Sequence, residues 1–137
     1  MADGAMSKKL KIKPGQRIAR VGAPDGYLQQ LRPLPQRVEV AIKLQGKLDW
    51  IQVFVKDKAQ LEKAIPRIVQ SLKPDGMLLI SYPKGTSKTQ TDLTRDKGWE
   101  GIQEADLKWI TLVSVDNTWS AFALRPYRPE EAKQPFR

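Results

Sequence analysis

The chain has 137 residues, of which 40% are hydrophobic and 28% are charged, a balance that is typical of one globular domain with a buried core. It contains neither cysteine nor histidine, which excludes disulfides, thiolate nucleophiles and zinc ribbons and removes the commonest general base. The formal net charge is +9. This excess indicates either an anionic partner or only a soluble basic surface, and we favour the surface because most of the cations alternate with acids.

The sequence predicts neither a membrane helix nor a signal peptide. No apolar run approaches the roughly 20 residues of a membrane helix, and residues 1–7 lack the apolar core of a signal peptide. We therefore expect a cytoplasmic protein that does not enter a membrane. Residues 1–9 are small or charged, so we expect them to form a disordered tail.

Short elements are predicted next along the chain. Residues 17–21 are predicted to form a strand that runs directly into the Gly22–Gly26 loop. Residues 27–31 allow a turn or two of helix before the following prolines prevent more. A second strand is predicted over residues 37–42, where valines and an isoleucine alternate with other residues.

The middle of the chain has the clearest pattern. Residues 48–55 are almost continuously apolar, as in a strand that is buried on both faces. Asp57 is placed to cap a helix, with Gln60 three residues later to complete a capping box. Apolar residues then recur at helical spacing up to Leu72. Pro66 lies inside this pattern, so we expect a kink or a break into two short helices there.

The C-terminal half repeats the alternation of strand and helix. The predicted elements, in order, are a turn at 73–76 that ends the helix, a strand at 77–82, a polar loop at 83–90, a helix at about 92–105, a strand at 107–115, a turn at 116–118 and a last strand at 119–124. The fold class expected is α/β: a three-layer Rossmann-like arrangement with a mostly parallel sheet of about six strands and an antiparallel C-terminal hairpin.

At this point the chain resembles a known family. The stretch Ile18–Gly26 is similar to the glycine-rich first motif of Rossmann-like methyltransferases that use S-adenosylmethionine (SAM). Residues 48–51 resemble the strand before their catalytic loop, and residues 72–80 resemble their Leu-Lys-Pro-Gly-Gly turn and strand. The resemblance implies a methyltransferase-like domain over residues 10–126. From Pro126 onward the chain holds three prolines and several charges, so we expect residues 127–137 to form a loosely ordered tail.

A closer resemblance is to a family of small bacterial proteins of unknown function that carry a truncated methyltransferase-like pattern. Four stretches of the chain match its signature: 13–15, 21–26, 91–96 and 116–120. The likeness is specific for the fold. It implies no reaction, because none is assigned to that family.

The residues that would bind SAM depart from the methyltransferase pattern. Gly22 and Gly26 match the outer glycines, but the middle glycine is Pro24, which lacks a backbone N–H. Arg20 stands where the family has an acid that holds the amino-acid end of the cofactor. Lys43 stands where a second acid grips the ribose hydroxyls. We therefore expect a degenerate SAM site and no ordinary SAM binding.

The same replacements would suit an anion such as a phosphate or a nucleotide, at the carboxyl ends of the parallel strands. A purely structural interpretation is also open, in which Asp92 and Thr94 cap a helix, Arg95 forms a local ion pair and the glycines serve only their turn. No catalytic or metal-binding residue is predicted. The candidate ligand-binding residues are Arg20, Gly22, Pro24, Asp25, Gly26, Lys43, Lys84, Asp92, Thr94, Arg95 and Trp119.

Three functions stay open. We favour a non-catalytic binding or interaction module, with self-association as a homodimer through the exposed edge of the C-terminal hairpin. The second is a divergent SAM-dependent methyltransferase, for which Asp49, Asp57 and Tyr82 are the candidate groups. The third is a basic accessory protein that binds nucleic acid or a phosphate ligand. Nucleic acid is not favoured, since no recognition helix, zinc finger or paired-aromatic motif is present.

Overall fold

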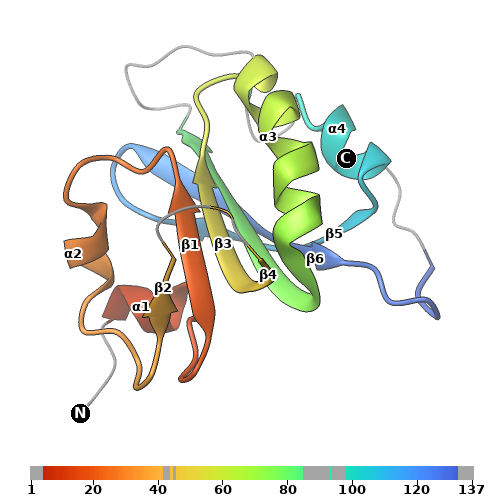
Figure 1. Ribbon diagram of the computed structural model, residues 1–137. Coiled ribbons are helices and arrows are strands. Elements are labelled where there is room, and N and C mark those ends of the chain that lie inside the picture. Colours follow the sequence, from red (N-terminus) through yellow and green to blue (C-terminus); the bar gives the residue numbers. More distant parts are fainter. Residues whose placement is uncertain (1–4, 42–43, 45, 85–92, 94–97, 133–137) are drawn as a thin grey trace.

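The protein folds around a mixed β-sheet with helices on both faces (Figure 1). The computed structural model describes residues 5–41, 44, 46–84, 93 and 98–132. Within these residues the elements are α1 (Ala5–Lys9), β1 (Arg17–Val21), α2 (Tyr27–Leu31), β2 (Glu39–Val40), β3 (Leu48–Phe54), α3 (Lys58–Ser71), β4 (Leu72–Pro83), α4 (Glu100–Glu104), β5 (Leu107–Ser114) and β6 (Trp119–Pro126). No helix in this part of the chain is long and apolar enough to cross a membrane.

The described strands form one six-stranded sheet in the order β2-β1-β3-β4-β6-β5. The pairs β1–β2, β1–β3 and β3–β4 are parallel, and β6 runs antiparallel to both of its neighbours, β4 and β5. This topology confirms the predicted α/β class with its antiparallel C-terminal hairpin. Because the first four strands are parallel, their carboxyl ends meet at the same end of the sheet.

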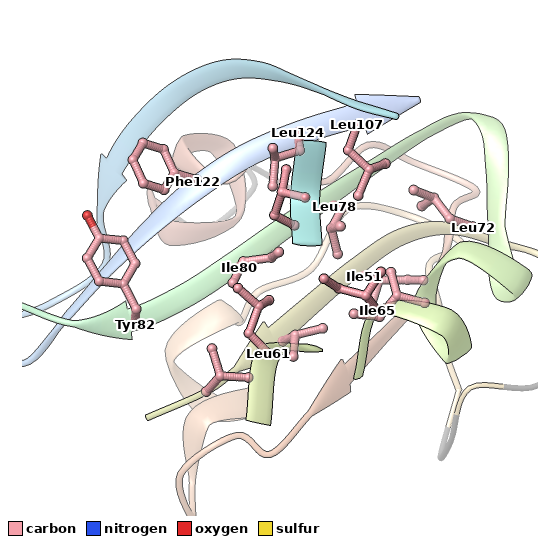
Figure 2. Close-up of a cluster of buried hydrophobic side chains, with 14 of the residues drawn as sticks. Ile51, Leu61, Ile65, Leu72, Leu78, Ile80, Tyr82, Leu107, Phe122 and Leu124 are labelled. Atoms are coloured by element: carbon pink, nitrogen blue, oxygen red, sulfur yellow. The ribbon is translucent and has the colours of Figure 1, made fainter. Parts of the chain in front are cut away.

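Alternation along β3 divides the core between the two faces. Ile51 and Val53 join the hydrophobic cluster that α3 and α4 cover, part of which Figure 2 shows. Trp50 and Phe54 join a second cluster, to which α2 contributes and against which α1 packs. Successive side chains of a strand point to opposite faces, so the nearly continuous apolar run in β3 supplies buried side chains to both layers of the core.

Helix α3 begins as predicted. The backbone N–H of Gln60 donates to Asp57 Oδ1 at 2.8 Å, and Gln60 Oε1 accepts from the backbone N–H of Lys56 at 2.7 Å. We expected a kink or a break at Pro66, and the break does not occur, because α3 is one helix from Lys58 to Ser71. Pro66 is exposed, as is Glu62 four residues earlier, so the carbonyl that loses its partner lies on the solvent side of the helix.

Our expectation of disorder up to residue 9 was wrong for residues 5–9, which form α1. The hydroxyl of the buried Ser7 donates to the carbonyl of Leu31. The indole N–H of Trp50 donates to the carbonyl of Leu10 at 2.9 Å. Leu10 and Ile12 are both buried, so tertiary contacts order a segment whose exposed lysines suggested a solvated tail.

The turn expected at residues 73–76 was also wrong. Strand β4 starts at Leu72, directly after α3, and the pairing with β3 shifts register between Leu48 and Trp50. This irregularity accommodates the Lys-Pro-Asp-Gly sequence inside the strand. A Cβ at Gly76 would lie 2.7 Å from the Leu72 side chain and 3.2 Å from the carbonyl oxygen of Asp49, which explains the glycine.

Strand β2 and helix α4 also differ from the predictions. Strand β2 is shorter than the predicted 37–42 and spans only Glu39–Val40. Helix α4 begins at Glu100, after Gly98 with its φ of 96°. The expected helix start at 92 and residues 94–97 lie outside the described residues.

The C-terminal segment is held to the sheet as far as it is described, contrary to the loose tail that we expected. Glu131 accepts hydrogen bonds from both terminal nitrogens of Arg125 at 2.7 Å and from Lys108 Nζ at 2.6 Å. The backbone N–H of Tyr127 also donates to the carbonyl of Asp106 at 3.4 Å. Charge pairing, which composition alone does not reveal, orders residues that follow β6.

Candidate functional site

A cavity of about 720 Å³ lies at the carboxyl ends of β1 and β3. These strands run parallel with Val21 opposite Val53, so both reach the cavity with their last residues. Ligand pockets commonly measure roughly 300–1,000 Å³ and occur at this end of a doubly wound sheet. The cavity therefore occupies the place that the topology favours for a ligand.

The first wall of the cavity is the loop after β1, represented by Gly22 and Pro24. Gly22 has a φ of 68°, and a Cβ there would lie 2.8 Å from the carbonyl oxygen of Phe54. Gly26 has a φ of 77° at the start of α2, and a Cβ added there would meet no atom within 4 Å. Both glycines thus serve the backbone of this loop, whether or not a ligand approaches it.

The second wall is basic. Gln60, Lys63, Ala64 and Arg67 line the cavity from α3, and Lys56 does so from the segment before this helix. The four helical positions follow the spacing i, i+3, i+4, i+7, which places them along one stripe of the helix. The described lining contains three cations and no carboxylate. This wall therefore favours a negatively charged group.

The third wall is aromatic. The half-buried Trp119 lies edge to face with Phe54, with ring centroids 5.1 Å apart, and Phe54 makes a similar contact with Tyr27 at 4.7 Å. The turn before β6 fixes Trp119, because Asp116 Oδ1 accepts from the backbone N–H groups of Thr118 and Trp119 at 2.8 and 2.9 Å. The cavity is thus basic along α3 and aromatic at the start of β6.

Tyr27, which contacts Phe54, belongs to a buried network of hydrogen-bonded side chains. The Tyr27 hydroxyl donates to Gln52 Oε1 at 2.7 Å, and Gln52 Nε2 donates to Ser81 Oγ at 2.9 Å. Burial raises the pKa of Tyr27 well above its usual value. The phenol therefore stays neutral and is no proton acceptor near neutral pH. These hydrogen bonds join α2, β3 and β4.

None of the three groups considered for methyl transfer lies on the cavity lining. Asp49 is near the amino end of β3, where burial would raise its pKa but hydrogen bonds from the Arg17 N–H and Lys73 Nζ outweigh burial and lower it. Asp57 caps α3. Tyr82 is buried and packs against aromatic rings of the core.

The candidate residues from the sequence divide between several places. Gly22, Pro24 and Trp119 come together on the cavity lining, whereas Arg20 is half-buried in β1 opposite Gln52. Asp25 and Gly26 belong to the same loop as Gly22 but do not line the cavity. Lys43, Asp92, Thr94 and Arg95 lie outside the described residues.

Lys84 is directed to the hairpin rather than to the cavity. Its Nζ donates to Ser114 Oγ at 2.6 Å, and its backbone N–H donates to the carbonyl of Thr118 at 2.8 Å. The sequence interpretation missed five polar lining residues, namely Lys56, Gln60, Lys63, Arg67 and Thr118. The stripe of Gln60, Lys63 and Arg67 beside the apolar stripe of α3 was the signal available for three of them.

The edge of the hairpin and the carboxylates relate to the expected homodimer and to metal binding. Strand β5 is the outer strand of the hairpin, and its Ile110 and Leu112 side chains are exposed at 41% and 42%; the homodimer through this edge stays a prediction. In the described part of the chain, no three carboxylates lie close enough together to hold a metal ion.

Comparison with known proteins identifies the fold. No protein-family model matches the sequence, and no curated protein matches it either. Among solved structures, an O-methyltransferase family 2 protein from Planctomyces limnophilus is similar with a TM-score of 0.62 at 14% identity, over 83% of this chain and 50% of that one. This chain therefore spans about half the length of that enzyme.

Two more solved structures are similar over most of their own length. A TehB-like SAM-dependent methyltransferase from Corynebacterium glutamicum has a TM-score of 0.55 at 13% identity, over 90% of this chain and 88% of that one. The [4+2]-cyclase SpnF has a TM-score of 0.60 at 10% identity, over 88% and 78%. The chain therefore has the fold of SAM-dependent methyltransferases, as the resemblance of its motifs implied.

Proposed function

We propose that this protein is a non-catalytic binding module on a methyltransferase fold, and that its cavity takes a small ligand bearing a negative charge in place of SAM. The observation that carries this proposal is the basic wall, where Lys56, Lys63 and Arg67 line the cavity and the described lining has no carboxylate. A site built for an anion needs such donors, because charge-assisted hydrogen bonds are the strong ones.

SAM does not fit these residues. The cofactor carries positive charge on its sulfonium and its ammonium groups, which three cations repel. The position two residues before Gly22 holds Arg20 instead of an acid, and Pro24 in the loop has no N–H to donate.

The described lining holds no carboxylate that could act as a general base, which favours binding over catalysis. The neutral polar groups are Gln60 and Thr118, and neither is an effective general base near neutral pH. The similarity to a [4+2]-cyclase as well as to methyltransferases agrees with the general rule that a fold does not determine its reaction. The function must be sought in the residues of the cavity.

Calorimetric titration with two ligands tests this proposal. At low ionic strength we expect pyrophosphate to bind and S-adenosylhomocysteine, the product of methyl transfer, to give no heat at millimolar concentration. Lys63→Gln and Arg67→Gln should each weaken pyrophosphate about 10-fold, the effect of losing one hydrogen bond to a charged group. Lys9→Gln is the matched control, because Lys9 is an exposed lysine of α1 away from the cavity.

The opposite result has an equally definite meaning. Micromolar binding of S-adenosylhomocysteine, with affinity unchanged or improved in Lys63→Gln, would restore the methyltransferase hypothesis. Pyrophosphate binding that Lys9→Gln weakens as much as Lys63→Gln would reduce the effect to net charge and remove the case for this cavity.

A further inference from the structure

We propose that the ligand joins a flat aromatic ring to a phosphate group, with the phosphate against α3 and the ring against Trp119. This inference rests on the proposed function, since it requires the cavity to bind an anion. The inference adds an aromatic ring to the anionic group of the proposed ligand. Cations of α3 and the indole of Trp119 line the same cavity.

The basic wall is concentrated on one element and has no evident structural purpose. Lys63 and Arg67 are both exposed and stand four residues apart on α3, where like charges oppose helix formation. No acid on the described lining compensates them. Arg67 offers a planar fork of donors that matches a phosphate, and Lys63 adds a point charge beside it. One end of the cavity thus has the donors that a phosphate needs.

The aromatic wall offers a fixed surface on which a flat ring can stack. Trp119 is half-buried and lines the cavity, whereas Trp50 and Trp99 are fully buried in the core. Its contact with Phe54, and the hydrogen bonds that the backbone N–H groups of Thr118 and Trp119 donate to Asp116, fix the position of the residue before any ligand arrives. A pre-positioned indole stacks on a flat ring with little loss of conformational freedom.

The floor and the size of the cavity favour one ligand with both parts. Val21, Val53 and Val55 also line the cavity, so a wholly charged ligand would lie partly on apolar surface. A volume of about 720 Å³ greatly exceeds that of a bare phosphate. A ring linked to a phosphate fills the apolar part and reaches the cations. Nucleotides have this chemistry, and so do simpler aryl phosphates.

Calorimetric titration of the whole chain with four ligands tests the inference. ADP and 1-naphthyl phosphate carry both parts, pyrophosphate carries only charge and adenosine only a ring. We expect ADP or 1-naphthyl phosphate to bind at least about 10-fold more tightly than pyrophosphate, given the usual contribution of base–aromatic stacking, and adenosine to bind weakly. Tighter binding of ADP would indicate that the ligand is a nucleotide. Tighter binding of 1-naphthyl phosphate would indicate an aryl phosphate without ribose.

Substitution of Trp119 separates this inference from the proposed function. Trp119→Leu should weaken ADP and 1-naphthyl phosphate about 10-fold while leaving pyrophosphate unchanged, and Trp119→Phe should recover much of the loss because it restores a ring. Quenching of tryptophan fluorescence by ADP in the wild type, and its absence in Trp119→Phe, gives a readout that does not depend on the stability of Trp119→Leu.

Two contrary outcomes are distinguishable. If pyrophosphate binds as tightly as ADP and 1-naphthyl phosphate, and Trp119→Leu changes none of them, the aromatic half is wrong and the anion site stands. If none of the phosphates binds the folded wild type, both the inference and the proposed function are overturned.

Discussion

The carbonyl oxygen of Phe54 lies 2.8 Å from the position that a Cβ of Gly22 would occupy. The end of β3 therefore excludes any side chain from the first glycine of the loop after β1, independently of a cofactor. This contact explains how a glycine of the methyltransferase-like motif is required in a loop that has lost the acid and the middle glycine. A glycine in such a motif is thus weak evidence for SAM.

Replacing Gly22 by alanine should destabilise the protein by about 3 kcal/mol, from a left-handed backbone conformation and a contact shorter than van der Waals distance. Gly26→Ala is the matched control, because Gly26 has a similar φ of 77° but no neighbour within 4 Å, and should cost only about 1 kcal/mol. Chemical denaturation measures both. Equal losses would show that Phe54 moves aside and that only the backbone conformation matters.

Replacing Pro66 should increase the stability of the protein, in contrast to the replacement of Gly22. Pro66 is an exposed residue inside α3, where it removes one backbone hydrogen bond. Pro66→Ala should restore this bond and stabilise the protein by about 1–3 kcal/mol, up to the difference in helix propensity between these residues. A rise in the denaturation midpoint without a change of slope is expected. A loss of stability would instead indicate that the helix backbone around Pro66 is adapted to the proline ring.

The sequence predicted the strands more reliably than the ends of the chain, for a physical reason. Strand β3 has an almost unbroken apolar run, and β1 was located to the residue because the glycine loop follows it directly. Helix α1 was missed because its order comes from Ser7 and Leu10 contacting residues more than 20 positions away. A local sequence pattern does not reveal such long-range contacts.

The candidate site was predicted only in part. Gly22, Pro24 and Trp119 were found because they follow or begin strands, and strand ends are visible in sequence. The cations of α3 were missed because a polar stripe usually means a solvated helix face. Only the position of α3 beside the end of β1 makes Lys63 and Arg67 part of a cavity.

Alkaline pH should weaken the fold through Tyr27. Its pKa is raised in the folded state by burial, so the folded protein holds this proton more tightly than the unfolded chain does. The resulting stabilisation is complete below the unfolded pKa of about 10 and is lost progressively as the pH rises above it. Tyr27→Phe should remove this component of the pH dependence.

The same variant has a measurable effect at neutral pH. Tyr27→Phe leaves Gln52 Oε1 buried without its donor, which should cost about 1–3 kcal/mol. The difference in unfolding free energy between wild type and variant should therefore shrink between pH 9 and pH 11. A constant difference over this range would mean that the phenol is accessible to hydroxide without unfolding.

Glu131 should control the order of the segment after β6. Hydrogen bonds from Arg125 and Lys108 and from the backbone of Arg128 hold its pKa well below its usual value. A lowered carboxyl pKa adds stability above the unfolded pKa of about 4.3, and this stability disappears as the pH falls below it. Glu131→Gln should increase amide exchange at residues 127–132 at pH 7, and acid should do so in the wild type. Unchanged exchange in the variant would assign the order of this segment to its backbone contacts.

Lys63→Glu gives the sharpest separation between stability and binding. In the wild type Lys63 and Arg67 repel each other across one turn of α3; a glutamate would instead form an i, i+4 pair with Arg67 in the favourable orientation, a change of about 0.5–1 kcal/mol toward greater stability. The same change puts a negative charge on the cavity wall and should abolish pyrophosphate binding. Lys9→Glu controls for net charge and should do neither. Ligand binding that survives in Lys63→Glu would show that this stripe is only a solvated helix face, whereas a more stable protein without binding would show that α3 gives up stability to keep its cations.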